Sequence, residues 1–189
     1  DTIALMPFNF AFNWFIRRRM AQIDLARREP VESQRALMGH LLFQGAKTSF
    51  GREHGLQEVR NLRAFKQQVP VRTYDELKPW IEQAIAGQSD VLWPGMTAWF
   101  AKSSGTTSDR SKYLPITQES LKEGHFKGGK DLLALFCEQR PSAKLYEGKH
   151  LVLGGARAAE SKDQPFIGDL SAIVMNELPF WVEARRTPS

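Results

Sequence analysis

The sequence lacks several patterns that would point directly to a function. It has one cysteine, Cys137, in 189 residues, which excludes an intramolecular disulfide and favours a reducing compartment such as the cytoplasm. The four histidines never stand three or four residues apart, so the spacing of a protein-ligated metal site is absent. Basic residues are scattered, and neither zinc knuckles nor the glycine–aromatic signature of RNA-binding sheets occurs, so no nucleic-acid partner is expected.

Long hydrophobic runs are missing as well. The apolar N-terminal stretch at 3–20 is shorter than the span of about 20 apolar residues that a membrane helix needs, and Pro7, Asn9 and Asn13 interrupt it. Its charges follow the apolar part, unlike those of a signal peptide. We expect a helix whose aromatic face packs on its own domain. The alternative is a non-catalytic module that uses this aromatic and basic segment at a membrane surface or a partner.

The overall composition is that of a globular protein. Hydrophobic residues make up 42% and charged residues 25%, which is enough apolar surface for a packed core. The formal charge of +5 is mildly basic and favours anionic ligands in general. Cys137 lies in an apolar helical run, which predicts a buried structural thiol and not a nucleophile.

Residues 1–92 are predicted to form a mainly helical N-terminal region. Apolar spacing gives two helices between 20 and 46, divided near Pro30. A short helix is expected to begin at Asn61. Thr73 stands three residues before Glu76, the capping-box arrangement, and the helix that follows should end near Gly87 and bend or divide at Pro79.

Residues 93–189 are predicted to form an α/β segment. A strand before residue 103, a helix after residue 116 and the apolar strand "KHLVLGG" have the form of a βαβ crossover, which indicates a parallel sheet. The stretch "SSGTTSDRSK" then falls after a strand and before a helix. Ligands of open α/β sheets bind at that end of the strands.

This stretch has the chemistry of a phosphate-binding loop. Gly105 permits close backbone approach, Lys102, Arg110 and Lys112 supply positive charge, and hydroxyl groups supply hydrogen bonds. The hydroxyl donors are Ser103, Ser104, Thr106, Thr107 and Ser108. Neither the Walker pattern nor the dinucleotide fingerprint fits. A solvated polar connection is the structural alternative.

The ordered motifs resemble a known family. "SSGTTSDRSKYLP" resembles the first nucleotide-binding motif of the adenylate-forming superfamily. "AKTSFGREHGL" and "FKQQVPVRTYDELKPWIEQAIAGQSDVLWPG" precede it, and the series resembles the N-terminal part of the auxin-responsive Gretchen-Hagen-three family of acyl-acid amido synthetases. The resemblance runs from residue 34 to residue 115 and continues more weakly to the end.

This resemblance implies a fold, and it implies how much of the family's N-terminal domain the chain covers. The fold is α/β, a helical region followed by part of the parallel-sheet subdomain of an adenylate-forming enzyme. Both predicted segments would belong to one larger, truncated N-terminal domain of a bacterial-looking member. The later family motifs are not in the sequence. We therefore expect a fragment that is inactive alone and that self-associates through uncovered edges.

The resemblance also implies an activity. The intact protein would activate a small carboxylic acid with ATP and Mg²⁺ and transfer the acyl group to an amine or amino acid. Lys112 and Thr106 would be catalytic. The nucleotide-binding set would be Ser103, Ser104, Gly105, Thr106, Thr107, Ser108 and Lys112. An acyl-coenzyme A ligase of the phenylacetate type is the alternative within the superfamily.

Overall fold

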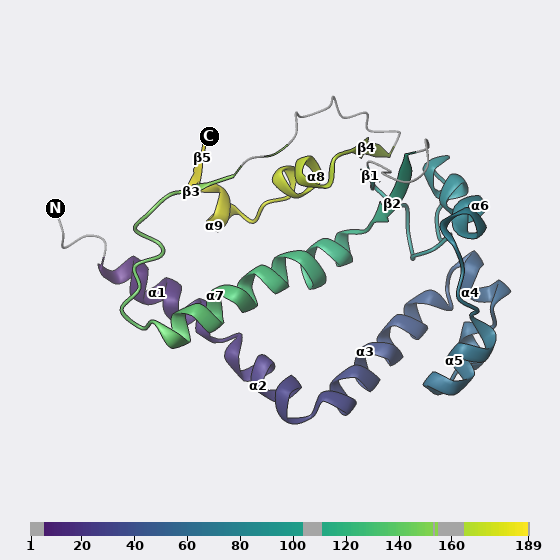
Figure 1. Ribbon diagram of the computed structural model, residues 1–189, viewed down its shortest axis with the longest axis horizontal. Helices are drawn as coiled ribbons and strands as arrows, with labels where there is room; N and C mark the ends of the chain where they lie inside the picture. Colours follow the sequence, from purple (N-terminus) through teal and green to yellow (C-terminus); the bar gives the residue numbers. More distant parts are fainter. Residues whose placement is uncertain (1–5, 104–110, 153, 155–164, 189) are drawn as a thin grey trace. The chain divides into compact units, whose positions relative to one another are not determined.

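The computed structural model of the chain (Figure 1) describes residues 6–103, 111–152, 154 and 165–188. The fold is mixed α/β, with mostly helices and small sheets, as predicted. The helices are α1 (Met6–Arg17), α2 (Met20–Arg28), α3 (Pro30–Gly45), α4 (Ser49–Glu53), η1 (Leu56–Glu58), α5 (Leu62–Gln68), α6 (Tyr74–Ile85), η2 (Ser120–Phe126), α7 (Lys127–Gln139), α8 (Leu170–Asn176) and α9 (Phe180–Glu183). The strands are β1 (Trp99–Ser103), β2 (Lys112–Ile116), β3 (His150–Leu151), β4 (Phe166–Gly168) and β5 (Arg186–Thr187). Among the described helices, none has the length and apolar character needed to cross a membrane.

The contacts divide the chain into two compact units. Unit 1 comprises residues 1–33, 119–154 and 174–189, and unit 2 comprises residues 34–118 and 155–173. The domain boundary that the sequence places at residue 92 stays a prediction.

Unit 2 contains a three-stranded sheet in the order β2-β1-β4. β1 pairs antiparallel with β2 and parallel with β4. The expected parallel pairing therefore occurs, but its partner is Phe166–Gly168 and not the "KHLVLGG" strand. That strand, β3, pairs with β5 in unit 1. Local hydrophobic pattern identifies a strand, whereas its partner depends on long-range contacts that the pattern does not encode.

The core of unit 2 joins α6 to this sheet. Phe100 of β1 is fully buried and packs with Ile81, Ala84 and Val91, and partly buried residues of α6 and β2 surround them. Figure 1 shows α6 beside β2. The helix is continuous through Pro79, so of the bend or division expected there, the division does not occur.

The "TSFGRE" element of unit 2 is a tightly packed helix start. Thr48 caps α4: its hydroxyl accepts from the Gly51 amide at 2.9 Å and donates to the Gly45 carbonyl at 2.7 Å. A β-carbon on Gly51 would lie 1.9 Å from the Gly45 carbonyl oxygen, so only glycine fits. The element therefore has a packing and capping role.

In unit 1, α1 packs along α7. Ile16 is fully buried, and Arg17 and Glu138 form an ion pair at 2.7 Å. Phe12 stacks on Tyr146 with ring centroids 4.9 Å apart. Trp14, however, remains 59% exposed. The expectation that the aromatic face of this helix packs on its own domain therefore holds for only part of that face.

We predict that Phe100→Ala lowers the free energy of unfolding by about 3–5 kcal/mol, because it removes a buried ring and leaves a cavity. Val71→Ala, at a fully exposed position of the same unit, is the control and should change the free energy by less than about 0.5 kcal/mol. Chemical denaturation followed by circular dichroism measures both. Equal midpoints for the two variants would show that Phe100 is not at the centre of the core.

Candidate functional site

The first candidate site lies where the chain leaves and re-enters the unit 2 sheet. β1 ends at Ser103 and β2 begins at Lys112, and these two residues are paired in register. Ser104, Gly105, Thr106, Thr107 and Ser108 lie outside the described residues, so their predicted roles are untested. The strand β2 lies between this segment and helix η2, so the segment joins two paired strands.

Lys112 is exposed at the first position of β2. Its Nζ lies 5.5 Å from the centroid of the Tyr74 ring, within the range of a cation–π contact. Ser103 is half-buried on the paired strand. The structure therefore places a cation and a hydroxyl, both predicted as ligand-binding, at the two ends of the 104–110 segment.

Tyr74, which the sequence indicated only as part of a helix start, reaches the same strand. Its hydroxyl accepts a hydrogen bond from the Tyr113 amide at 2.8 Å and lies 3.5 Å from the Tyr113 carbonyl oxygen, to which it can donate. Tyr113, which follows Lys112, is thus hydrogen-bonded to the first residue of α6. No sequence pattern signalled this contact, because it joins residues 39 positions apart.

The start of α6 is fixed by its predicted capping box. The Glu76 carboxylate accepts from the Thr73 amide at 2.6 Å and from the Thr73 hydroxyl at 2.8 Å, and the Thr73 hydroxyl accepts from the Glu76 amide at 3.4 Å. The hydrogen bond from the Thr73 backbone is the main cause that lowers the pKa of Glu76, followed by the bond from its side chain. Both bonds favour the charged carboxylate.

Arg72, the residue before the Thr73 cap, is fixed by contacts with His54 and Trp80. The His54 ring donates from Nδ1 to the Phe50 carbonyl at 2.8 Å, and its Nε2 accepts from Arg72 at 2.9 Å. The Arg72 guanidinium also lies 5.3 Å from the Trp80 ring centroid. The cluster links α4 to α6, and each ring nitrogen of His54 already has a partner, so we assign it a structural role.

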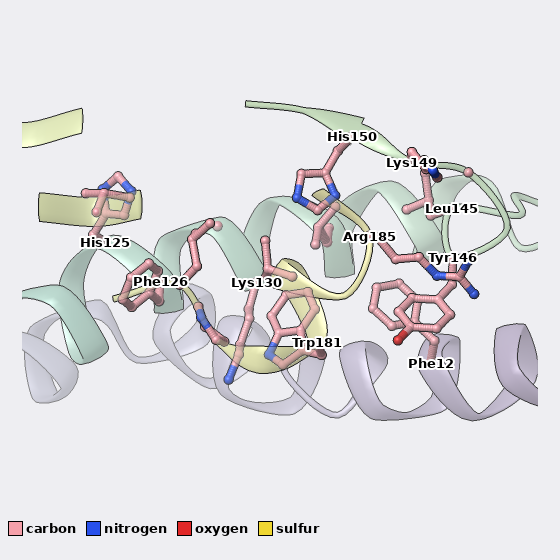
Figure 2. Close-up of a pocket in the computed structure, with 17 residues that line it drawn as sticks. Phe12, His125, Phe126, Lys130, Leu145, Tyr146, Lys149, His150, Trp181 and Arg185 are labelled. Atoms are coloured by element: carbon pink, nitrogen blue, oxygen red, sulfur yellow. The ribbon is translucent and has the colours of Figure 1, made fainter. Parts of the chain in front are cut away.

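The second candidate site is a pocket of about 450 Å³ within unit 1 (Figure 2), a volume typical of small-molecule sites. Helix α7, the C-terminal residues and the segment around β3 supply most of its wall. The lining residues are Phe12, His125, Phe126, Gly129, Lys130, Leu133, Leu145, Tyr146, Gly148, Lys149, His150, Val174, Leu178, Pro179, Trp181, Val182 and Arg185. Those described residues include three permanent cations and no carboxylate.

Aromatic rings and cations alternate along this pocket. In Figure 2 the Trp181 ring lies between Lys130 and the stacked pair of Phe12 and Tyr146. The Lys130 ammonium is 5.9 Å from the Trp181 ring centroid, and the Arg185 guanidinium is 4.6 Å from that of Tyr146. The pocket thus offers apolar walls and positive charge to an organic anion.

One polar atom at this pocket is buried and unpaired. The Nε2 atom of His150 is inaccessible to solvent and has no hydrogen-bond partner in the described part of the chain. A buried polar group without a partner costs folding free energy. Sequence reasoning missed this pocket, because its residues extend from position 12 to position 185.

No metal cluster accompanies either site within the described ranges, where no group of three or more His, Cys, Asp or Glu residues could hold an ion. Cys137 is buried, its thiol 3.5 Å from the Asn13 side-chain oxygen, and burial raises its pKa. This bears out the burial predicted for the thiol.

Comparison with known proteins identifies the family. The model of the GH3 family N-terminal domain matches residues 19–189, so the chain belongs to the GH3 family. This is the family that the motif series resembled.

Individual relatives are plant enzymes. The chain is 32% identical over 100 residues to indole-3-acetic acid-amido synthetase GH3.2 of Arabidopsis thaliana, covering 52% of this chain and 18% of that protein. It is 32% identical over 89 residues to indole-3-acetic acid-amido synthetase GH3.8 of Oryza sativa subsp. indica, covering 47% of this chain and 15% of that protein. The chain therefore matches less than a fifth of the length of these relatives.

Solved structures show the same fold. The GH3.15 acyl acid amido synthetase superimposes with a TM-score of 0.71 at 19% identity, covering 85% of this chain and 29% of that protein. A second structure, AtGH3.15 acyl acid amido synthetase in complex with 2,4-DB, gives a TM-score of 0.67 at 21% identity, covering 84% of this chain and 28% of that protein.

We predict that Thr73→Ala raises the pKa of Glu76 part of the way toward the ordinary value of a glutamate, because the bond from the Thr73 hydroxyl to the carboxylate is lost while the main bond, from the Thr73 amide, remains. The wild-type bonds stabilise unit 2 above the ordinary carboxylate range, and this contribution is lost as pH falls through the lowered pKa. Carboxyl-carbon NMR titration measures the shift. Glu82, which pairs with Lys78, serves as the internal control. An unchanged Glu76 titration would show that the Thr73 hydroxyl does not bind the Glu76 carboxylate in solution.

Proposed function

We propose that the intact protein is an ATP-dependent acyl-acid amido synthetase. A carboxylate oxygen of the substrate attacks the α-phosphorus of ATP, and the bond to pyrophosphate breaks. An amine then attacks the carbonyl carbon of the acyl-adenylate, AMP leaves with the carboxylate oxygen, and the amine loses a proton. Membership of the GH3 family supports this proposal, together with the amide-forming activities in the names of its relatives.

The observation that carries the proposal is the pairing of Ser103 with Lys112 at the two ends of the Ser/Thr/Gly segment. A carboxylate must approach a polyanion, so the reaction depends on donors and positive charge aimed at the phosphates. The Lys112 ammonium would neutralise the β- and γ-phosphates. Thr106 or Thr107 would help place Mg²⁺. The proposed phosphate cradle comprises Ser103, Ser104, Gly105, Thr106, Thr107 and Ser108.

We also propose that the unit 1 pocket binds the carboxylic acid. Its aromatic walls suit an apolar acyl body, and the absence of acidic residues among its described lining suits a carboxylate. The structure in complex with 2,4-DB has an organic acid bound, which agrees with this class of ligand.

An amine acceptor is preferred to coenzyme A because the relatives carry amido synthetase names. Incubation of the intact protein with ATP and an acid, and with either an amino acid mixture or coenzyme A, separates the two. Mass spectrometry should detect the amide. Formation of the thioester alone would assign the protein to the other type of ligase.

We predict that Lys112→Ala and Thr106→Ala each lower acid-dependent pyrophosphate release by the intact protein about tenfold or more, since a charge-assisted hydrogen bond contributes about 1.5–3 kcal/mol. Lys66→Ala, which removes an exposed lysine from α5, is the matched control and should keep full turnover. If both site variants retain the wild-type rate and ATP affinity, the segment is a solvated connection without a role in phosphate binding.

We predict that Trp181→Ala raises the KM for the carboxylic acid about tenfold and leaves the KM for ATP unchanged, because one apolar wall of the pocket is removed. Phe180→Ala is the control, since Phe180 is 84% exposed and does not line the pocket. Steady-state kinetics with indole-3-acetic acid and 2,4-DB measures both constants. An unchanged acid KM in the Trp181 variant would exclude the pocket as the acid site.

A further inference from the structure

We propose that Tyr74 is a positioning residue for Lys112. This inference rests on the proposed function, in which the Lys112 ammonium neutralises ATP phosphates. Tyr74 would hold both the strand that carries Lys112 and the Lys112 ammonium itself. It belongs to α6, and nothing in the sequence pattern separates it from an ordinary helix start.

The first element of this proposal is the backbone of β2. In the sheet order β2-β1-β4, β2 is a terminal strand, so alternate amide and carbonyl groups point away from β1. At Tyr113 these outward groups meet the Tyr74 hydroxyl, at 2.8 Å from the amide nitrogen and 3.5 Å from the carbonyl oxygen. The Tyr74 hydroxyl therefore binds the backbone groups of Tyr113 that a neighbouring strand would otherwise bind.

The second element is the Lys112 side chain. A lysine ammonium on a flexible four-carbon stem loses conformational entropy when it binds, unless a contact has already restricted it. The Tyr74 ring lies 5.5 Å from the Lys112 Nζ, where the electron-rich face of the ring attracts the cation. The same side chain thus restricts the strand and its charged group.

The third element is the rigidity of Tyr74. It is the first residue of α6, and the capping box of Thr73 and Glu76 defines that helix start. Arg72, two residues earlier, is held by His54 and the Trp80 ring. Tyr74 also packs against the buried cluster around Phe100. Because these contacts restrict Tyr74, its hydroxyl can hold β2 at a defined position.

The experiment is a double-mutant cycle on pyrophosphate release by the intact protein. Tyr74→Phe keeps the ring and removes the hydroxyl, so we expect kcat to fall about three- to tenfold. Tyr74→Leu also removes the ring and should cost more. In the Lys112→Ala background, Tyr74→Phe should have little further effect, because the group that it positions is absent.

Two readouts separate positioning from a general loss of stability. Ser49→Ala removes another partly buried hydroxyl of unit 2, which donates to the Val91 carbonyl at 3.3 Å, and should lower stability without lowering kcat. Hydrogen exchange at the Tyr113 amide should become faster in Tyr74→Phe and stay unchanged in Ser49→Ala.

The outcomes distinguish this proposal from the proposed function. If Lys112→Ala keeps full turnover, the proposed role of Lys112 in neutralising the phosphates is wrong, and so is the positioning role of Tyr74. If Lys112→Ala loses turnover but Tyr74→Phe does not, only the positioning role is wrong. If Tyr74→Phe lowers kcat by the same factor in the wild-type and Lys112→Ala backgrounds, the positioning role is also wrong, because the effect does not depend on Lys112.

Discussion

One tyrosine hydroxyl binds the backbone of the terminal strand in the unit 2 sheet, and we propose that the candidate phosphate site depends on that contact. A terminal strand has a row of polar backbone groups without a strand partner, and at Tyr113 the Tyr74 hydroxyl lies within reach of both. Because α6 packs on the core around Phe100, the contact fixes β2 relative to that core. β2 in turn fixes the point at which the chain returns from the 104–110 segment.

Local signals were sufficient to predict several helix starts. Asn61 and Thr73 cap α5 and α6 as expected, because a short polar side chain that binds an amide three residues later leaves a pattern in sequence. Strand pairing was predicted less well. The edge position of β2 could have been inferred from Pro115, since proline cannot donate to a sheet and is largely confined to edges and bulges.

The two candidate sites differ in how far sequence could reveal them. The Ser/Thr/Gly segment is contiguous, so its motif was recognisable and the family membership bears out that recognition. The unit 1 pocket combines Phe12 with residues near positions 130, 150 and 181, which only folding brings together. Composition predicted a general preference for anions, through a formal charge of +5, and this stays a prediction. It could not locate the cations around a pocket that has no carboxylate among its described lining.

The most direct test of the account follows the oxygen that joins the two substrates. The intact protein is incubated with ATP, an amino acid and a carboxylic acid that carries heavy oxygen in its carboxylate, and the nucleotide products are analysed by mass spectrometry. Attack of the carboxylate on the α-phosphorus predicts that AMP carries one heavy oxygen per amide formed. Unlabelled AMP, or ADP together with labelled inorganic phosphate, would contradict the account.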